Sequence, residues 1–186
     1  DFDLIKIKKK LKIPLNLEMA PTNEMLKIAI KYKPKFVCLV PEKRNEITTE
    51  GGLNLKKKNK FLKKIIHQLK KNQIRVTLFI EPKKSDINLS KKLGADSVEL
   101  HTGRFCNLLN NRKNYFKEYS KIKNAAIFSR KIGLDVHAGH GLTYKSAKII
   151  LNIREINEYN IGHFIISESI FVGLKHSIKK FKKILK

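Results

Sequence analysis

Acidic residues, cysteine and long apolar runs are all scarce in this chain of 186 residues, and each shortage excludes a class of protein. The two cysteines, Cys38 in an apolar run and Cys106 in a polar loop, show neither metal-ligand spacing nor a disulfide framework. No apolar stretch approaches the roughly 18 residues of a membrane span, and the basic N-terminus lacks the apolar core of a secretory signal. The sequence therefore predicts a soluble protein of the reduced cytoplasm with no membrane partner.

The shortage of acidic residues leaves a strongly basic chain, with 16 Asp and Glu against 41 Lys and Arg and a formal net charge of +25. A basic surface attracts phosphate groups, so nucleic-acid binding is one hypothesis. However, only 6 of the basic residues are Arg, and the lysines are spread over nearly every predicted helix among abundant Asn and Ile. This mixture is typical of a genome with A/T-rich codons. We therefore favour a compositional origin of the charge and expect no nucleic-acid partner.

Six strand-like runs alternate with segments of helical periodicity, which predicts an α/β fold. The runs are 15–19, 36–40, 74–80, 97–101, 134–138 and 159–163. Thr22 is predicted to cap a helix that Pro34 ends, and strands joined by helices run parallel. The apolar content of 41% is enough for a substantial core, so we expect one domain over residues 1–186.

Polar side chains recur at alternate positions of several of these strands. Alternation puts Asn16 with Glu18 on one face, Asp135 with His137 on one face, and Glu99 on the same face as Ser97 and His101. Parallel sheets are otherwise apolar on both faces, so these positions predict the inside of an α/β barrel.

Four of the six histidines are predicted to lie at strand ends, namely His101, His137, His140 and His163. In an α/β barrel the side chains at the C-terminal ends of the strands converge on one mouth, where the chemistry takes place. One alternative is a zinc site of His101, His137 and His140 in a metal-dependent hydrolase. We favour it less, because His137 and His140 lie across a strand-loop junction where their rings need not converge.

The number of strands is too small for a closed barrel, which needs eight. Six are predicted, and a helix near residues 3–11 already precedes the first of them. The chain also begins at Asp1 rather than at methionine, so we expect a processed protein or a fragment. The predicted fold is a TIM (β/α)8 barrel that lacks its first two strand-helix units and keeps about six of the eight strands.

Several short motifs together resemble one family, the pyridoxine 5'-phosphate synthases of vitamin B6 biosynthesis. They occupy residues 16–20, 38–44, 48–52, 99–103, 138–144 and 160–163, in the family's order along nearly the whole chain. The resemblance implies a barrel enzyme that joins 1-deoxy-D-xylulose 5-phosphate to 3-amino-2-oxopropyl phosphate, giving pyridoxine 5'-phosphate, phosphate and water. It implies no cofactor and no metal, and a homo-oligomer that is an octamer in the family.

The resemblance also assigns roles to residues of this chain. Glu18 matches the family's general acid/base on the third barrel strand, and His140 matches its proton donor. Carboxylates and imidazoles suit a ring closure that requires repeated proton transfers. From the residues alone, the alternative for Glu18 is a structural acid bonded to a neighbouring strand, which we favour less, and His140 is equally well explained as a loop histidine held by backbone contacts.

The phosphate-binding positions follow in the same way. Thr48 matches a contact to the deoxyxylulose phosphate. The positions that bind the amino-ketone phosphate in the family correspond to Gly141, Gly162 and His163. Barrels commonly hold phosphate after the last two strands, on backbone N–H groups and a helix N-terminus. Without the resemblance the glycines indicate ordinary turns and Thr48 a helix cap. Glu99 and His101 are expected to line the site without direct chemistry.

Some positions depart from the family pattern. The family's first two strands supply an Asn, an Asp-His pair, an Arg, a catalytic histidine and an Arg-containing phosphate loop, and none is present here. His137 stands where asparagine is usual, and Ser167 and Glu168 stand where Gly-Arg is usual. An inactive, truncated remnant that acts as a binding scaffold is therefore the alternative to an active synthase.

Overall fold

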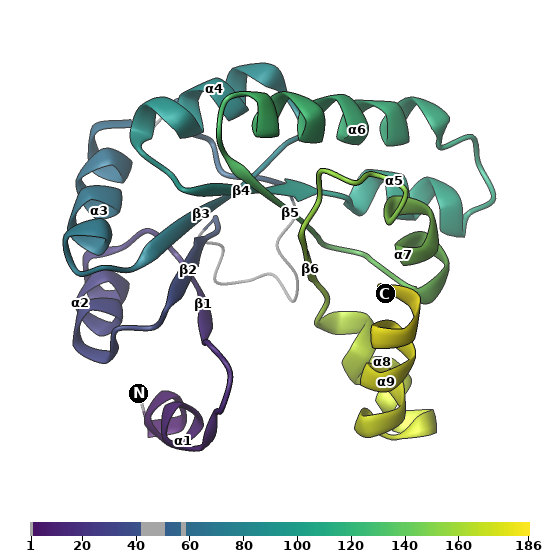
Figure 1. The fold of residues 1–186 in the computed structure, drawn as a ribbon, viewed down its shortest axis with the longest axis horizontal. Coiled ribbons are helices and arrows are strands. Elements are labelled where there is room, and N and C mark those ends of the chain that lie inside the picture. Colours follow the sequence, from purple (N-terminus) through teal and green to yellow (C-terminus); the bar gives the residue numbers. More distant parts are fainter. Residues whose placement is uncertain (1, 42–50, 57–58) are drawn as a thin grey trace. The chain divides into compact units, whose positions relative to one another are not determined.

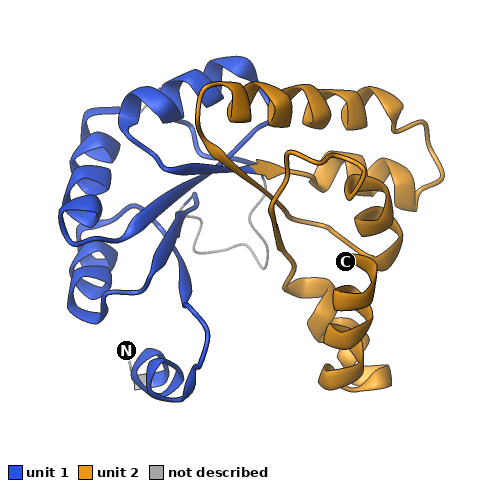
Figure 2. Cartoon of the chain, in the orientation of Figure 1, with its two compact units in different colours: residues 1–99 blue, residues 100–186 orange. Residues whose placement is uncertain are grey.

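The computed structural model describes residues 2–41, 51–56 and 59–186, and helices alternate with strands through them (Figure 1). The chain divides into two compact units, Asp1–Glu99 and Leu100–Lys186, with the boundary inside the fourth strand (Figure 2). Within each unit the strands lie in chain order. The α/β character predicted from the sequence is confirmed, and a single domain over residues 1–186 stays a prediction.

The described residues of the first unit form three strands and four helices before the boundary strand. They are α1 (Phe2–Lys10), β1 (Asn16–Met19), α2 (Asn23–Tyr32), β2 (Phe36–Leu39), α3 (Asn59–Lys71), β3 (Arg75–Ile80), α4 (Lys84–Leu93) and β4 (Ser97–His101). β1 pairs with β2, and β2 with β3, in parallel. Because parallel neighbours need a crossover connection, α2 and α3 follow from the pairing.

Apolar side chains on alternate strand positions form the core of this unit. Val37, Leu39, Val76 and Leu78 have no exposed surface, and α3 packs against β3. The helix contributes an apolar stripe at helical spacing, Leu62, Ile65, Ile66 and Leu69, all of it buried. Because these apolar side chains occupy one face of the strands, the polar positions lie on the opposite face.

The predicted helix that starts at Thr22 is confirmed as α2. The Thr22 hydroxyl oxygen accepts a hydrogen bond from the Met25 N–H at 3.2 Å, as an N-cap does. The helix ends at Tyr32, and its C-cap residue, Lys33, adopts a left-handed conformation directly before Pro34. Proline disfavours helical conformation in the residue before it, so the position of this end follows from the sequence.

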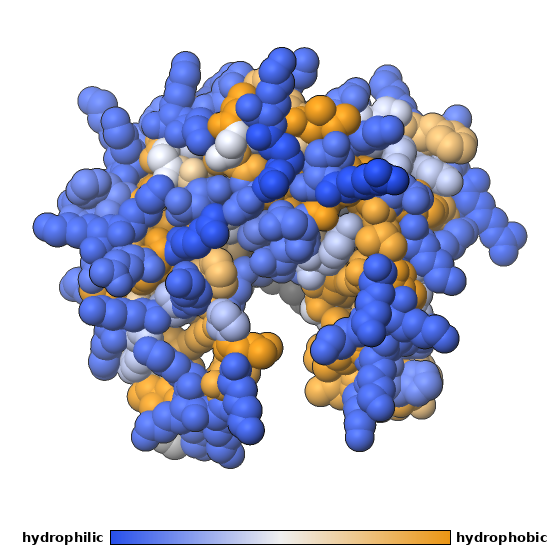
Figure 3. Space-filling model, viewed as in Figure 1, coloured by the Kyte–Doolittle hydropathy of each residue, from blue (hydrophilic) through white to orange (hydrophobic). Residues whose placement is uncertain are grey.

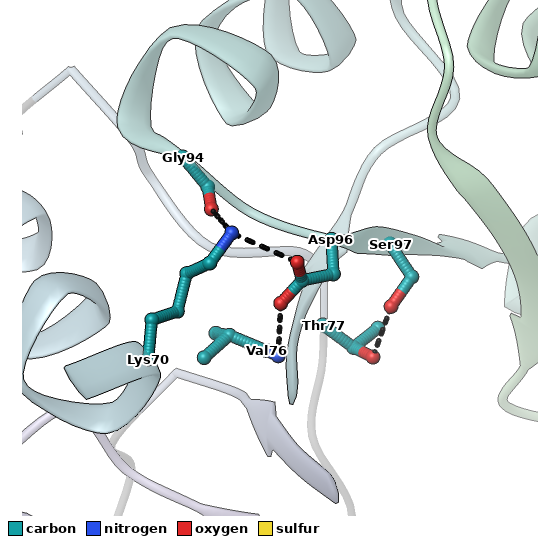
Figure 4. A network of polar contacts seen from close by, with 6 residues as sticks. All are labelled: Lys70, Val76, Thr77, Gly94, Asp96 and Ser97. Atoms are coloured by element: carbon teal, nitrogen blue, oxygen red, sulfur yellow. Dashed lines mark hydrogen bonds and ion pairs between the residues drawn. The ribbon is translucent and has the colours of Figure 1, made fainter. Parts of the chain in front are cut away.

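A polar network ties α3, β3 and β4 together (Figure 4). The Lys70 ammonium donates to the Gly94 carbonyl at 2.9 Å and to Asp96 Oδ1 at 2.8 Å. The other Asp96 oxygen accepts from the Val76 N–H at 2.9 Å, and the Asp96 N–H donates to the Val76 carbonyl at 2.9 Å. Asp96 therefore fixes the start of β4 beside β3 with both its side chain and its backbone.

We expect Asp96→Ala to lower the free energy of unfolding by about 1–3 kcal/mol, because it leaves the Val76 N–H without its carboxylate acceptor. Urea unfolding followed by circular dichroism measures the change. Lys64→Ala, an exposed lysine on the same helix as Lys70, is the control and should stay within about 0.5 kcal/mol of the unmodified chain. Equal effects of the two substitutions would contradict the role of Asp96.

The second unit continues from β4 with two strands and five helices. They are α5 (Gly103–Asn110), α6 (Phe116–Lys131), β5 (Asp135–Gly139), α7 (Tyr144–Ile150), β6 (Glu158–Asn160), α8 (His163–Val172) and α9 (Leu174–Ile184). β5 and β6 pair in parallel, with His137 opposite Glu158 and Gly139 opposite Asn160. Val136, Ala138, Ala147 and Ile150 form a fully buried part of its core.

The predicted strands agree with the structure to within one residue, except for the last. The run 159–163 is wrong at its end, because β6 stops at Asn160 and His163 is the first residue of α8. The end of β6 depends on the strand that it pairs with, β5. β5 ends at Gly139 and His140 turns into a left-handed conformation, so β6 has no strand beside it beyond Asn160. His163 therefore lies at a helix start rather than at a strand end.

Hydrophilic side chains dominate the face shown in Figure 3, and they are spread over both units. Apolar side chains are also exposed on α8, which buries none of its residues. Ile170 and Phe171 are 79% and 85% exposed. Through the part of the chain that the structure describes, no helix combines the length and apolar character needed to cross a membrane.

Candidate active site

In the first unit, the strand register brings polar residues into one row. Glu18 lies opposite Cys38 on the next strand, and Cys38 lies opposite Thr77. The Cys38 thiol donates a hydrogen bond to Glu99 Oε2 at 3.3 Å, and the Thr77 and Ser97 hydroxyls are 2.6 Å apart. The polar positions predicted on β1 and β4 are therefore linked across β2 and β3 by Cys38 and Thr77, which the sequence analysis did not predict as part of this face.

Glu18 is the acid of this row that keeps access to solvent. It is exposed, whereas the next residue, Met19, is buried. The protein around the carboxyl group still removes enough water to raise the pKa of Glu18 above its ordinary value. A carboxyl group that is reachable by solvent and holds its proton to higher pH is suited to general acid/base chemistry.

Glu99 is buried instead, at 5% exposure, and so is Cys38 at 2%. A carboxylate inside a core needs hydrogen-bond donors, because its transfer from water is otherwise very unfavourable. The Cys38 thiol supplies one of them. The sequence analysis missed this contact because residues 36–40 read as a uniformly apolar strand, although alternation already places Cys38 on the polar face.

In the second unit, His101 and His140 come together. The two rings are 4.7 Å apart between centroids and meet edge to face at 61°. Both pack over Gly103, where an added Cβ would lie 2.7 Å from His101 Nε2 and 2.7 Å from His140 Cδ2. A side chain at residue 103 would therefore displace one or both imidazoles, and its absence leaves room for the pair.

The backbone of the His140 loop adopts an uncommon conformation. His140 and Gly141 both have φ of 77°, in the left-handed region, which costs a residue with a side chain about 1–3 kcal/mol. An added Cβ at Gly141 would lie 3.2 Å from the Cys106 Cβ, so glycine is favoured there by its φ and by its close packing. Burial raises the pKa of the Cys106 thiol above its ordinary value.

Thr102 connects the two histidine-bearing segments. Its hydroxyl lies 2.8 Å from the Gly139 carbonyl oxygen and 2.7 Å from that of His140. Its N–H also donates to the Gly139 carbonyl at 2.9 Å. The sequence analysis missed Thr102 as well, and the available signal was its position inside the motif at 99–103.

Gly162 and His163 form the exposed start of α8. Gly162 is the N-cap of this helix, and nothing lies within 4 Å of a Cβ placed there. The first N–H groups of a helix have no partner within the helix and attract anions. The segment is thus open to a ligand, and no neighbouring atom forces residue 162 to be glycine.

Thr48 lies outside the described residues. The segment after it is tied to the end of β3, since the Gly52 N–H donates to Glu81 Oε1 at 3.1 Å and the Leu53 N–H donates to the Phe79 carbonyl at 2.8 Å. An added Cβ at Gly52 would lie 2.5 Å from the Glu81 nitrogen. Residue 52 therefore has to be glycine for this contact to form.

His137 is buried and faces β6, with Nδ1 3.4 Å from Glu158 Oε1. Within the described ranges, no three or more His, Cys, Asp and Glu side chains form a group that could hold a metal ion. Of the three histidines of the zinc alternative, the structure brings His101 and His140 together at their rings and places His137 against Glu158.

Sequence comparison gives a match over the whole chain. The family model described as pyridoxal phosphate biosynthesis protein PdxJ matches residues 1–186. The pyridoxine 5'-phosphate synthase of Pelagibacter ubique is 52% identical over 184 residues, covering 99% of this chain and 77% of that protein. The enzymes of the same name from Ehrlichia chaffeensis and a Sulfurihydrogenibium species are 50% and 48% identical, covering 98% and 100% of this chain and 74% and 76% of their own lengths.

Solved structures resemble this one at low sequence identity. A structure described as native KDPGal has a TM-score of 0.61 and 10% identity, and the match covers 98% of this chain and 74% of that one. Citrate synthase SbnG has a TM-score of 0.54 and 10% identity, with 92% and 73% covered. At this identity the similarity concerns the fold alone.

Proposed function

Because the chain belongs to the PdxJ family of pyridoxal phosphate biosynthesis proteins, an enzyme family of vitamin B6 biosynthesis, we propose that it forms pyridoxine 5'-phosphate. The proposed substrates are 1-deoxy-D-xylulose 5-phosphate and 3-amino-2-oxopropyl phosphate, and phosphate and water are released. The observation that carries the proposal is the 52% identity over 184 residues with a synthase of this name. No cofactor takes part in the proposed reaction.

Glu18 and His140 are the proposed proton-transferring groups. Joining an amine to a ketone, eliminating water and phosphate and closing an aromatic ring all move protons, and each needs an acid or a base near its working pH. The raised pKa of Glu18 supports its role as such a group. For His140, the support is a ring held against His101 by a loop of defined conformation.

The phosphate groups are proposed to bind at Gly141, at Gly162 with His163, and at Thr48. The exposed N-terminus of α8 supports the second of these positions, because its N–H groups favour a dianion. The left-handed Gly141 supports the first, since a backbone without a side chain allows close approach of a ligand. Glu99 and His101 are proposed to line the site.

We further propose that the six strands belong to a (β/α)8 barrel and that the protein is a cytoplasmic homo-oligomer. The parallel strands in chain order support the barrel. The apolar side chains exposed on α8, Ile166, Ile170 and Phe171, support self-association. The two free cysteines fit a reducing compartment.

The test is to incubate the folded chain with both substrates and to follow pyridoxine 5'-phosphate by mass spectrometry and released phosphate by a colorimetric assay. Both products should form together, and omission of either substrate should abolish them. Binding of the substrates without any product would instead identify a binding scaffold and contradict the proposal.

A further inference from the structure

The Thr102 hydroxyl has hydrogen-bond partners that are unusual for a threonine at the start of a helix. Thr102 is the N-cap of α5, a position where a threonine side chain ordinarily accepts a hydrogen bond from its own helix. Here the side chain accepts no hydrogen bond from a backbone N–H of the helix, and its contact with α5 is the Cys106 thiol, which donates to the hydroxyl at 3.8 Å. The hydroxyl instead lies 2.8 Å from the Gly139 carbonyl oxygen and 2.7 Å from the His140 carbonyl oxygen, more than 30 residues away in the chain.

The two carbonyls that Thr102 reaches flank the point where β5 turns into the left-handed loop. His140 has φ of 77°, which a residue with a side chain adopts only when its surroundings hold it there. The Thr102 hydroxyl and N–H supply contacts on either side of this turn. Thr102 is fully buried, so water does not compete for these bonds.

The same residue also lies next to the point where the two imidazoles meet. Thr102 directly follows His101 and directly precedes Gly103, over which both rings pack. A bond from Thr102 to the His140 carbonyl therefore fixes the distance between the segment that carries His101 and the segment that carries His140. Small displacements of a catalytic group lower reaction rates strongly, so such a constraint has a functional consequence.

We propose that Thr102 is a positioning residue for His140, acting through hydrogen bonds to the backbone of the His140 loop. This inference rests on the proposed function for the proton-transferring role of His140. The hydroxyl group makes the contacts to both the Gly139 and His140 carbonyls on which this proposal rests. Thr102→Val removes it at nearly constant volume, and Thr102→Ser keeps it.

The first experiment is a double-mutant cycle on turnover. Thr102→Val should lower kcat on the order of 10- to 100-fold, and Thr102→Ser should retain most of the activity. In a His140→Asn background the same Thr102→Val should change kcat less than about twofold, because the group it positions is gone. An equal loss in both backgrounds would mean a general structural role and would overturn the proposal.

The second experiment does not depend on turnover. The ring resonances of His140, assigned by comparison with His140→Asn, are recorded by NMR in the full chain, together with the contact between its ring and that of His101. Thr102→Val should shift the resonances and weaken the contact, and Thr102→Ser should leave both in place. Unchanged resonances in Thr102→Val would overturn the proposal even if the chain proved to have a different activity.

Two controls separate positioning from loss of stability. Thr22→Val removes a different N-cap hydroxyl, in the first unit, and should lower stability without changing kcat or the His140 resonances. Where Thr102→Val does not fold, Thr102→Ala replaces it, because the smaller side chain fits the same space. Activity of Thr102→Ala equal to that of the unmodified chain would then overturn the proposal.

Discussion

Replacing Glu18 by Gln is expected to lower kcat about 1,000-fold, because general acid/base groups contribute roughly 10²- to 10⁴-fold to such reactions. The amide has nearly the shape of the carboxyl group and neither gains nor loses a proton. The measurement is the initial rate of pyridoxine 5'-phosphate formation at saturating concentrations of both substrates. Glu24→Gln, an exposed acid on α2, is the matched control and should keep full activity.

The pH dependence gives an independent check on Glu18. Burial raises its pKa above the ordinary value of 4.5, so a step that needs the carboxylate should become faster as the pH rises through this higher pKa. This limb of the kcat/KM profile should be absent from Glu18→Gln. An unchanged profile in the variant would contradict the assignment of the limb to Glu18.

Stability separates a catalytic effect from unfolding. A carboxyl group whose pKa is raised by folding binds more protons in the folded state, so its contribution to stability is present at low pH and lost as the pH rises through the raised pKa. Above that pH, folding keeps the Glu18 carboxylate in an unfavourable environment, which glutamine avoids. Glu18→Gln should therefore be inactive yet at least as stable as the unmodified chain.

Replacing His140 by Asn is expected to lower kcat on the order of 100- to 1,000-fold, because the proposed proton donor is lost. Asparagine is the preferred test residue, since it tolerates the left-handed φ of 77° better than most residues with a side chain. The change therefore removes the imidazole without straining the loop. Single-turnover measurements would place the loss in the chemical steps rather than in product release.

The control for His140 is His176→Asn, an exposed histidine on α9. It should keep full activity and the same melting temperature. A His140→Asn variant that retained the kcat of the unmodified chain would remove His140 from the mechanism. The adjacent His101 would then be the imidazole to test, since its ring contacts that of His140.

Strand and helix positions were predictable because they depend on local patterns. The strand-like run 74–80 predicted β3, and the Thr22 cap with Pro34 predicted both ends of α2. The end of β6 was not predictable in this way. It depends on where β5 stops pairing, which in turn depends on the left-handed turn at His140.

Candidate site residues were identified by type and motif, but their contacts were not. The family resemblance pointed to Glu18 and His140, and strand alternation placed His101 near the same mouth. Neither gave any indication that Cys38 would bond to Glu99, or that the Thr102 hydroxyl would reach the His140 carbonyl. Such contacts join residues more than 30 positions apart, and only the folded backbone brings them together.

The two buried cysteines allow the opening of each unit to be followed separately. Cys38 lies in the first unit and Cys106 in the second, and each is 2% exposed. A thiol that is sealed in a core reacts with an alkylating reagent only when the surrounding structure opens, so the labelling rate measures the free energy of that opening. Equal free energies of opening at both positions would mean that residues 1–186 unfold as one cooperative body. Unequal values would show which of the two units opens more readily.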